Sequence, residues 1–313
     1  MTELIPSWTE ANSQTFLDYG RYFVPERERQ IETICGLIPP LPSGVEIVEL
    51  CCGEGLLAQA LLERFPDATV RGLDGSSEML AAAGKRLAGF GERFRPRHFD
   101  LADNDWRAIR DAHAIVSSLA IHHLDGPEKQ ALFADVHRML APGGVFVIAD
   151  VIAPAGKQAE SVAADAWDWA VRQRSLELEG NLDGFELFQT EQWNLYRYFD
   201  PDDIDKPSPL FAQLQWLAAA GFVDVDVYWM QAGHAIFGGV KNDSTAKRSI
   251  SPRRHRGRRG NAGKFRRKPP RWARRLFAGE SKMKREIRLS DPTVHVSVID
   301  ALFGTTYAVR NTH

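Results

Sequence analysis

Apolar and polar positions change pattern along the chain, and between residues 45 and 150 the changes are regular. Short apolar runs, typical of buried strands, alternate with stretches in which apolar side chains recur every three or four residues, as on one face of a helix. Strands alternating with helices of these lengths indicate βαβ units and a mainly parallel sheet. The pattern predicts strands at 45–50, 69–73, 94–99, 114–117 and 145–150, and helices at 56–65, 77–87 and 127–140.

The segments on either side of this region are predicted to be helical. Residues 1–40 have the helical pattern, which Pro39 and Pro40 end. Residues 155–205 contain no strand pattern and include two aromatic, helix-like stretches, 159–179 and 188–199. We interpret 155–205 as a helical insertion over one end of the sheet.

A helix at 210–221 and two strands, at 223–231 and 234–240, complete the body. The predicted fold class is therefore α/β: a Rossmann-like, seven-stranded, mainly parallel sheet with helices on both faces and a helical insertion after strand five.

Charge divides the chain near residue 241. Residues 1–240 carry 19 Lys and Arg against 36 Asp and Glu, a net charge of −17, whereas residues 241–313 carry 20 against 5, a net charge of +15. Such asymmetry marks a boundary between parts of a chain. We expect an N-terminal helical lid over 1–40, a body over 41–241 with the insertion as its cap, and a basic tail of low order over 242–313.

The tail is most basic over residues 252–275. One interpretation is an arm that binds nucleic-acid phosphates. Another is a disordered, solvated extension, and a third is a reading frame that departs from the natural one after about Asn242. We favour disorder or such an artefact over RNA binding, because the body shows no basic face.

Composition narrows the class of protein. Apolar residues make up 44% of the 313, which suffices for a sizeable core. The first ten residues lack a basic start and an apolar run, and no stretch of about 18 apolar residues occurs, so we predict neither a secretory signal nor a membrane span. Three cysteines, Cys35, Cys51 and Cys52, have no evident pairing, which favours a reducing cytoplasm.

A glycine-rich loop follows the first predicted strand. Residues 53–58, GEGLLA, match the dinucleotide pattern G-x-G-x-x-G/A, although this match alone is weak. A dinucleotide places its pyrophosphate at the helix N-terminus behind such a loop. Glu49 at the strand end and Glu54 in the loop would oppose that charge, and they favour a cationic ligand.

Two further acids follow the next two predicted strands. Asp74 lies 25 positions after Glu49, and Asp100 lies 26 positions further on. An acid at the second strand end can accept both ribose hydroxyls. Asp100 can accept from an adenine amino group, with Leu101 against the ring. Parallel strand ends share one edge, so the three acids are expected to face a common crevice.

These motifs resemble those of the class I S-adenosylmethionine-dependent methyltransferases over roughly residues 20–240. The resemblance rests on VELCCGEG, GLDGSSEML, FDLAD, DAHAIVSSLAIHHL, LAPGGVFVIAD and AAGFVDVDVYW, in this order. It is closest to the small-molecule branch of the ubiquinone/menaquinone methyltransferase type. It implies S-adenosyl-L-methionine as cofactor and in-line methyl transfer without a metal, in which much of the catalysis is positioning. The implied cofactor-binding residues are Glu49, Cys51, Cys52, Gly53, Gly55, Asp74, Gly75, Met79, Asp100, Leu101, Ser117 and Ser118.

One position departs from the family pattern. Cys51 stands where the family usually has the first glycine of G-x-G-x-G, and we infer that this position does not require a glycine-only backbone conformation. Cys51 and Cys52 lack the spacing of a tetrahedral metal site, so we interpret them as small packed residues and predict no metal.

The catalytic residue remains open, with His122, His123 and Tyr22 as candidates. The two histidines follow the fourth strand, where a general base would be useful. We favour the alternative that one histidine packs on the sheet and the other caps a loop. The acidic stretch 200–205 is interpreted as a solvated loop.

Aromatic side chains are frequent in both flanking segments. In this family such segments often cover the cofactor or form the acceptor pocket, although aromatics at helical spacing are usually core. Candidate substrate-binding residues are Tyr19, Tyr22, Trp167, Trp169 and Tyr196, with Phe23, Trp193 and Tyr198 nearby in the same segments.

The main hypothesis is methyl transfer to a small, largely apolar acceptor. One alternative is an RNA or protein methyltransferase that uses the basic tail, and another is a catalytically silent ligand-binding module of the same fold. The sequence identifies neither the acceptor nor the atom methylated, and the oligomeric state also stays open.

Overall fold

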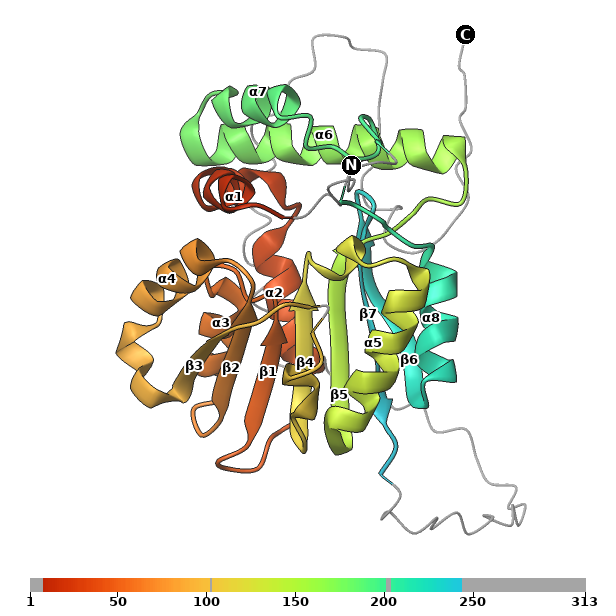
Figure 1. The fold of residues 1–313 in the computed structure, drawn as a ribbon. Helices are drawn as coiled ribbons and strands as arrows, with labels where there is room; N and C mark the ends of the chain where they lie inside the picture. Colours follow the sequence, from red (N-terminus) through yellow and green to blue (C-terminus); the bar gives the residue numbers. More distant parts are fainter. Residues whose placement is uncertain (1–7, 102, 201–203, 244–313) are drawn as a thin grey trace, which may run out of the picture. The chain divides into compact units, whose positions relative to one another are not determined.

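The computed structural model describes residues 8–101, 103–200 and 204–243. The chain divides into two units after Ser249, and the second unit, residues 250–313, lies outside the described residues. The predicted basic stretch 252–275 and the tail boundary at 242 therefore stay predictions. All that follows concerns the first unit (Figure 1).

A seven-stranded sheet forms the centre of this unit, in the order β3-β2-β1-β4-β5-β7-β6. Strands β1 to β5 pair in parallel, and β7 runs antiparallel to both of its neighbours. The predicted mainly parallel sheet is confirmed. The strands are β1 (Glu46–Leu50), β2 (Thr69–Asp74), β3 (Phe94–His98), β4 (Ala112–Ser118), β5 (Leu140–Val151), β6 (Phe222–Gln231) and β7 (His234–Lys241).

Helices cover both faces of the sheet, as predicted. On one face α2, α3 and α4 pack on side chains such as Ile47 and Val70, and on the other α5 and α8 pack on Val48 and Phe146. Successive strand residues point to opposite faces, so both faces are apolar and buried. The helices are α1 (Glu10–Phe23), α2 (Arg27–Leu37), α3 (Leu56–Arg64), α4 (Ser77–Arg86), α5 (Gly126–Met139), α6 (Lys157–Glu179), α7 (Asp183–Thr190) and α8 (Leu210–Ala219).

A separate layer lies beyond the carboxyl ends of the strands. In Figure 1, α1 crosses above the sheet, and α6 and α7 lie above α1. These three helices share a third apolar cluster, distinct from the two beside the sheet, that includes Phe23, Trp167, Val171 and Phe188. The insertion after β5 is therefore helical in its first part, as predicted.

Two local predictions differ from the structure, whereas the described part of the N-terminal segment is helical. It forms two helices, because the backbone turns at Glu26, whose φ of 46° is left-handed. The predicted helix at 188–199 ends at Thr190. The buried Asn194 side chain there accepts from Tyr196 N and donates to the Ala164 carbonyl, which stabilises a turn instead.

The fifth strand is longer than the sequence predicts. It begins at Leu140, which pairs with Ala112, and the register shifts between Ala112 and Ala114. Residues 141–144, APGG, which precede the predicted strand, therefore lie within β5 as an irregularity, with Gly143 at a φ of 77°.

Within the described residues, no helix is both long enough and apolar enough to cross a membrane.

The close approach of β5 and β7 gives a test of the fold. A Cβ at Gly238 would lie 2.1 Å from the carbonyl oxygen of Phe146, so Gly238→Ala requires the sheet to shift. Urea unfolding should show a loss of about 2–3 kcal/mol in the free energy of unfolding, the upper range for overpacking. Gly84→Ala in α4 is the control, because nothing lies within 4 Å of its Cβ position. It should raise the stability by about 0.5–1 kcal/mol, and equal effects of the two substitutions would contradict this account.

Candidate active site

Two buried carboxyl groups lie at the carboxyl ends of neighbouring strands. Glu49 is 2% exposed, and within the described residues its Oε2 has no hydrogen-bond partner. Asp74 accepts hydrogen bonds from Gly53 N at 2.7 Å and Ser76 N at 2.9 Å. Burial raises the pKa of both carboxyl groups, and the neighbouring charge of Asp74 raises the pKa of Glu49 further. A cationic group of a ligand beside Glu49 would stabilise the charged carboxylate and so lower the raised pKa of Glu49.

The loop between β1 and α3 has the left-handed turns that its glycines permit. Gly53 has a φ of 53° and Gly55 a φ of 81°, and a Cβ at Gly55 would come within 2.9 Å of Leu87. Cys51 has a φ of 55°. The inference that this position does not require a glycine-type conformation is therefore wrong: Cys51 adopts the left-handed conformation and bears its strain.

The two cysteines of the loop are free thiols. Burial raises the pKa of both, and nearby carboxylates, Asp74 for Cys51 and Glu49 for Cys52, raise it further. A thiol held neutral is a poor nucleophile and a poor metal ligand. This agrees with the interpretation of Cys51 and Cys52 as packed residues.

The other candidate cofactor residues lie at the same edge of the sheet, where the crevice is expected. Asp100 lies two residues beyond β3, close enough to Cys51 for its charge to raise the pKa of that thiol. Ser117 donates from Oγ to the Leu50 carbonyl at 3.2 Å. The remaining candidates lie along the same edge: Gly75 and Met79 at the start of α4, Leu101 after β3, and Ser118 at the end of β4.

An arginine that the sequence analysis did not single out also lies at this crevice. Arg27, the first residue of α2, has its guanidinium 5.2 Å from the ring centre of Phe16. Burial lowers the pKa of Arg27, and the charges of Glu54 and Glu49 partly offset this. Glu54 itself pairs with Arg86 at 2.5 Å. Because Glu54 is paired, Glu49 and Asp74 are the two acids whose negative charge would oppose a phosphate-bearing ligand.

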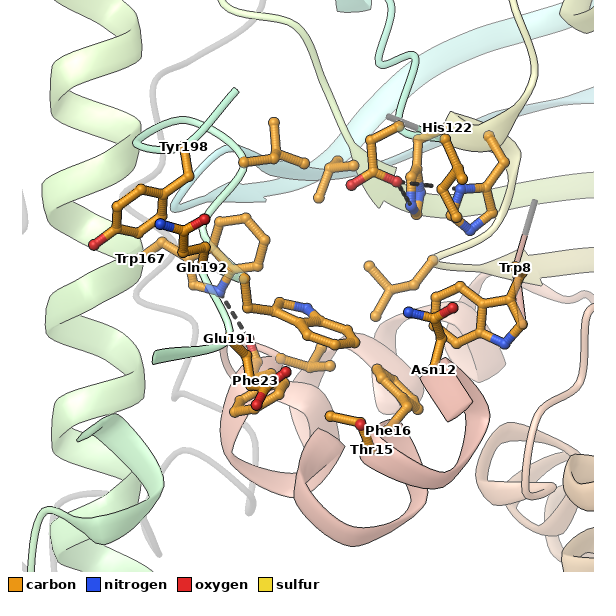
Figure 2. A pocket seen from close by; sticks show the side chains of 18 of the residues that line it. Trp8, Asn12, Thr15, Phe16, Phe23, His122, Trp167, Glu191, Gln192 and Tyr198 are labelled. Carbon is orange, nitrogen blue, oxygen red and sulfur yellow. Dashed lines mark hydrogen bonds and ion pairs between the residues drawn. The ribbon is translucent and has the colours of Figure 1, made fainter. Parts of the chain in front are cut away.

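A cavity of about 210 Å³ adjoins the carboxyl ends of β4 and β5 (Figure 2). Figure 2 shows Trp8, Asn12 and Phe16 on one side of it and His122 on another. Its lining combines aromatic rings with histidines and acids. The lining includes Trp8, Phe16, Phe23, His122, His123, Trp167, Glu191, Trp193, Asp200 and Asp205.

His122 is held by a buried carboxylate. Asp150 accepts from His122 N at 3.0 Å, and one of its oxygens lies 2.5 Å from His122 Nδ1. His122 Nε2 faces Asp205 at 3.3 Å. Burial alone would lower the pKa of His122, but the two carboxylates outweigh it and raise the pKa to about 10. His122 is therefore an imidazolium at neutral pH.

His123 shares the carboxylate of Asp205. Its Nδ1 lies 3.2 Å from Asp205 Oδ1, and its ring packs against Trp8 at 5.6 Å between centres. Burial and the charge of His122 lower the pKa of His123, so this imidazole is neutral at pH 7. Its unprotonated nitrogen can accept a proton at the cavity wall.

One sequence interpretation changes here, while that of the two histidines as packing and loop-capping residues stays a prediction. Both histidines face the carboxylate of Asp205. The stretch 200–205 is not merely a solvated loop, because Asp200, Ile204 and Asp205 line the cavity; residues 201–203 lie outside the described residues.

The histidine pair is also the one candidate metal-ligand group within the described residues. Atoms of His122, His123 and Asp205 lie within 4.8 Å of one another, a set that can hold a metal ion. The charge of His122 beside Asp205 accounts for part of this clustering, and the expectation of no metal stays a prediction.

Of the five candidate substrate-binding aromatics, Trp167 lines the cavity. Trp169 is 61% exposed on α6, and Tyr19 stacks beside Phe23. The structure places the other two outside the lining as well: the Tyr22 hydroxyl donates to Glu179 at 2.7 Å, and the Tyr196 hydroxyl donates to the carbonyls of Ile152 and Gly233.

Comparison with known proteins agrees with this arrangement. The model of the methyltransferase domain family matches residues 47–144. Trans-aconitate 2-methyltransferase of Acidovorax sp. (strain JS42) is 36% identical over 131 residues, 42% of this chain and 46% of that protein. The enzyme of the same name from Rhizobium meliloti (strain 1021) is 30% identical over 142 residues, 45% and 49% of the two chains. The chain thus spans about half the length of these relatives.

Solved structures share the fold at low sequence identity. An O-methyltransferase family protein from Burkholderia thailandensis has a TM-score of 0.54 at 16% identity, covering 75% of this chain and 61% of that one. Phosphoethanolamine N-methyltransferase 2 of Haemonchus contortus, solved with S-adenosyl-L-methionine, has a TM-score of 0.52 at 16% identity, covering 75% and 58%.

The sheet order and the acids at its carboxyl edge define a Rossmann-like methyltransferase fold. Residues 47–144 match the methyltransferase domain family, and the fold around them is that of S-adenosylmethionine-dependent methyltransferases.

The raised pKa of His122 predicts how stability changes with pH. The folded pKa of about 10 exceeds the unfolded value of 6.5, so the contribution to stability is complete below pH 6.5 and is lost as pH rises toward 10. In chemical unfolding, the stability difference between the wild type and His122→Gln should shrink across this range. Other groups titrating there, such as Lys129, cancel in the difference. A difference that stays constant or grows would contradict the assignment.

Proposed function

We propose that this protein transfers the methyl group of S-adenosylmethionine to a small, largely apolar acceptor bound in the cavity beside His122. The observation that carries the proposal is the pairing of two sites at one sheet edge. The expected cofactor crevice lies where β1 and β2 end, at the buried acids Glu49 and Asp74, and an aromatic cavity adjoins the ends of β4 and β5. Ligands of such sheets bind at this edge.

The residues of the crevice suit the cofactor. The unpartnered Oε2 of Glu49 can accept from the α-ammonium, and Asp74 can accept from the ribose hydroxyls. Arg27 supplies a cation for the cofactor's carboxylate, while Asp100 and Leu101 suit the adenine. When bound, S-adenosylmethionine supplies an electrophilic methyl group on a sulfonium.

The chain's own part in the reaction is to hold the acceptor and to manage its proton. The rings of Trp8, Phe16 and Trp193 present an apolar wall that excludes water from the acceptor. The histidine pair lies at the same cavity, and we propose neutral His123 as the proton acceptor, with His122 as a charged group fixed by Asp150. Tyr22 has no place in this scheme, because its hydroxyl faces Glu179 outside the cavity lining.

We also propose the cytoplasm as the compartment. The protein's three cysteines, Cys35, Cys51 and Cys52, are all free, as is usual where thiols are kept reduced.

Calorimetry with S-adenosylmethionine tests the cofactor assignment. Asp74→Asn removes one charged acceptor beside the ribose position, so the dissociation constant should rise about ten-fold or more. The control is Asp67→Asn, at the opposite end of the same strand and exposed. It should bind as the wild type does. Absence of binding to the wild type, or equal affinities for all three proteins, would refute the assignment.

Truncation tests the alternative in which the basic tail binds an RNA or protein substrate. A chain ending at Ser249 keeps every described element of the sheet and both sites. Release of S-adenosylhomocysteine with a small-molecule acceptor should persist at near the full-length rate. Turnover that depends on the tail, together with lost RNA binding, would favour the alternative.

A further inference from the structure

The acceptor cavity has a one-sided distribution of charge. Its lining includes the carboxylates of Glu191 and Asp205, and among its described lining residues there is no lysine or arginine. The cation that it does contain, His122, lies between Asp150 and Asp205 and is neutralised by them. The cavity therefore offers an incoming ligand more negative than positive charge.

Arginines of the covering helices are directed to other partners. Arg197 pairs with Asp165 and Asp168 at 2.7 Å each, and Arg21 pairs with Glu179 at 2.9 Å. Arg174 pairs with Glu28. These ion pairs join residues of the insertion to one another or to α1 and α2, and the arginines are not among the residues that line the cavity.

Aromatic rings form a continuous wall of the same cavity. Trp193 lies 6.1 Å from Phe16, 4.9 Å from Phe23 and 6.4 Å from Trp8 between ring centres, and Trp8 also packs on His123. Ring faces attract cations as well as apolar groups. Rings combined with nearby carboxylates are the usual protein environment for an organic ammonium group.

An anionic acceptor fits this environment poorly. A carboxylate moved from water into an aromatic cavity needs a paired cation, and next to Asp205 or Glu191 it meets like charge instead. Trans-aconitate, named for the relatives, is a tricarboxylic acid. Most of the lining lies outside residues 47–144, where the family match lies, so likeness there says little about the acceptor.

We propose that the acceptor is an amine with an aromatic or bulky apolar body, methylated on nitrogen. This inference rests on the proposed function and specifies its substrate class. The rings hold the apolar body, and the carboxylates of Asp205 and Glu191 attract the ammonium form.

The step balances with groups already described. The ammonium first loses a proton to a ring nitrogen of His123, the imidazole at the cavity wall whose Nδ1 lies 3.2 Å from Asp205. The nitrogen lone pair attacks the methyl carbon, an N–C bond forms, and the C–S bond breaks with its electron pair remaining on sulfur. The positive charge passes from sulfonium to nitrogen, giving an N-methylammonium and S-adenosylhomocysteine.

A series of probes that differ in charge alone tests the proposal. Tryptamine, tryptophol and indole-3-propionate share the indole ring system and a two-carbon chain, and carry charges of +1, 0 and −1. Binding is followed by isothermal titration calorimetry of the full-length protein with S-adenosylhomocysteine present. Phenyl and naphthyl series with the same three end groups cover other ring sizes. In at least one series the amine should bind about ten-fold or more tightly than its acid.

Variants of two lining carboxylates test whether the cavity causes the preference for the amine over the acid. Asp205→Asn and Glu191→Gln should each weaken binding of the preferred amine about three- to ten-fold and leave binding of the neutral alcohol within two-fold. Glu186→Gln, on α7 and exposed outside the lining, is the matched control and should change neither. Because the alcohol reports on the intact cavity, a variant that unfolds is recognised by loss of both.

The outcomes separate this inference from the proposed function. If in every series the acid binds as well as the amine or better, or if trans-aconitate is the acceptor that turns over, the amine inference is wrong while methyl transfer stands. If S-adenosylmethionine does not bind, the proposed function itself fails. Amine-selective binding with an N-methylated product, identified by mass and fragmentation, supports both.

Discussion

The arrangement of the acceptor side depends on one buried carboxylate, Asp150. It is 2% exposed and accepts from His122 N, from the His122 ring and from Val151 N. A buried charge left without partners is costly, so this carboxylate requires the loop after β4 to stay folded against the end of β5. His122 in turn accepts from Lys206 N at 2.8 Å and faces Asp205. Two loops far apart in sequence are thus positioned by the same charge.

A second buried charge stabilises the same region from below. Lys129 of α5 is 1% exposed and donates to the carbonyls of Leu124 and Lys206 and to the Ser208 hydroxyl, at 2.5 to 3.0 Å. Burial lowers the pKa of this ammonium to about 8, although the charge of Asp150 opposes the shift. The hydrogen bonds of Lys129 therefore fix the loop that carries Asp205. The position of this carboxylate at the cavity depends on a side chain buried in the fold.

Sequence reasoning succeeded where a signal is local and periodic. The seven strands, the helices of the sheet and the acids Glu49 and Asp74 follow from runs of apolar residues and from strand ends, since these are properties of short segments. Asp205 and Arg27 gave no such signal, because each becomes important only through a distant partner: the histidine pair for one, Glu49 for the other. Cys51 shows a different limit, since residue type alone did not reveal its left-handed backbone.

The covering layer has an apolar cluster of its own, centred on Phe23, Trp167 and Phe188 and separate from the two clusters beside the sheet. Side chains that pack in separate clusters can be exchanged without disturbing one another. Sequence drift in the layer then changes which molecules enter the cavity, while the machinery for the donor persists at β1 and β2. A lineage can in this way acquire new acceptors through substitutions in α1, α6 and α7, while the sheet below them stays unchanged.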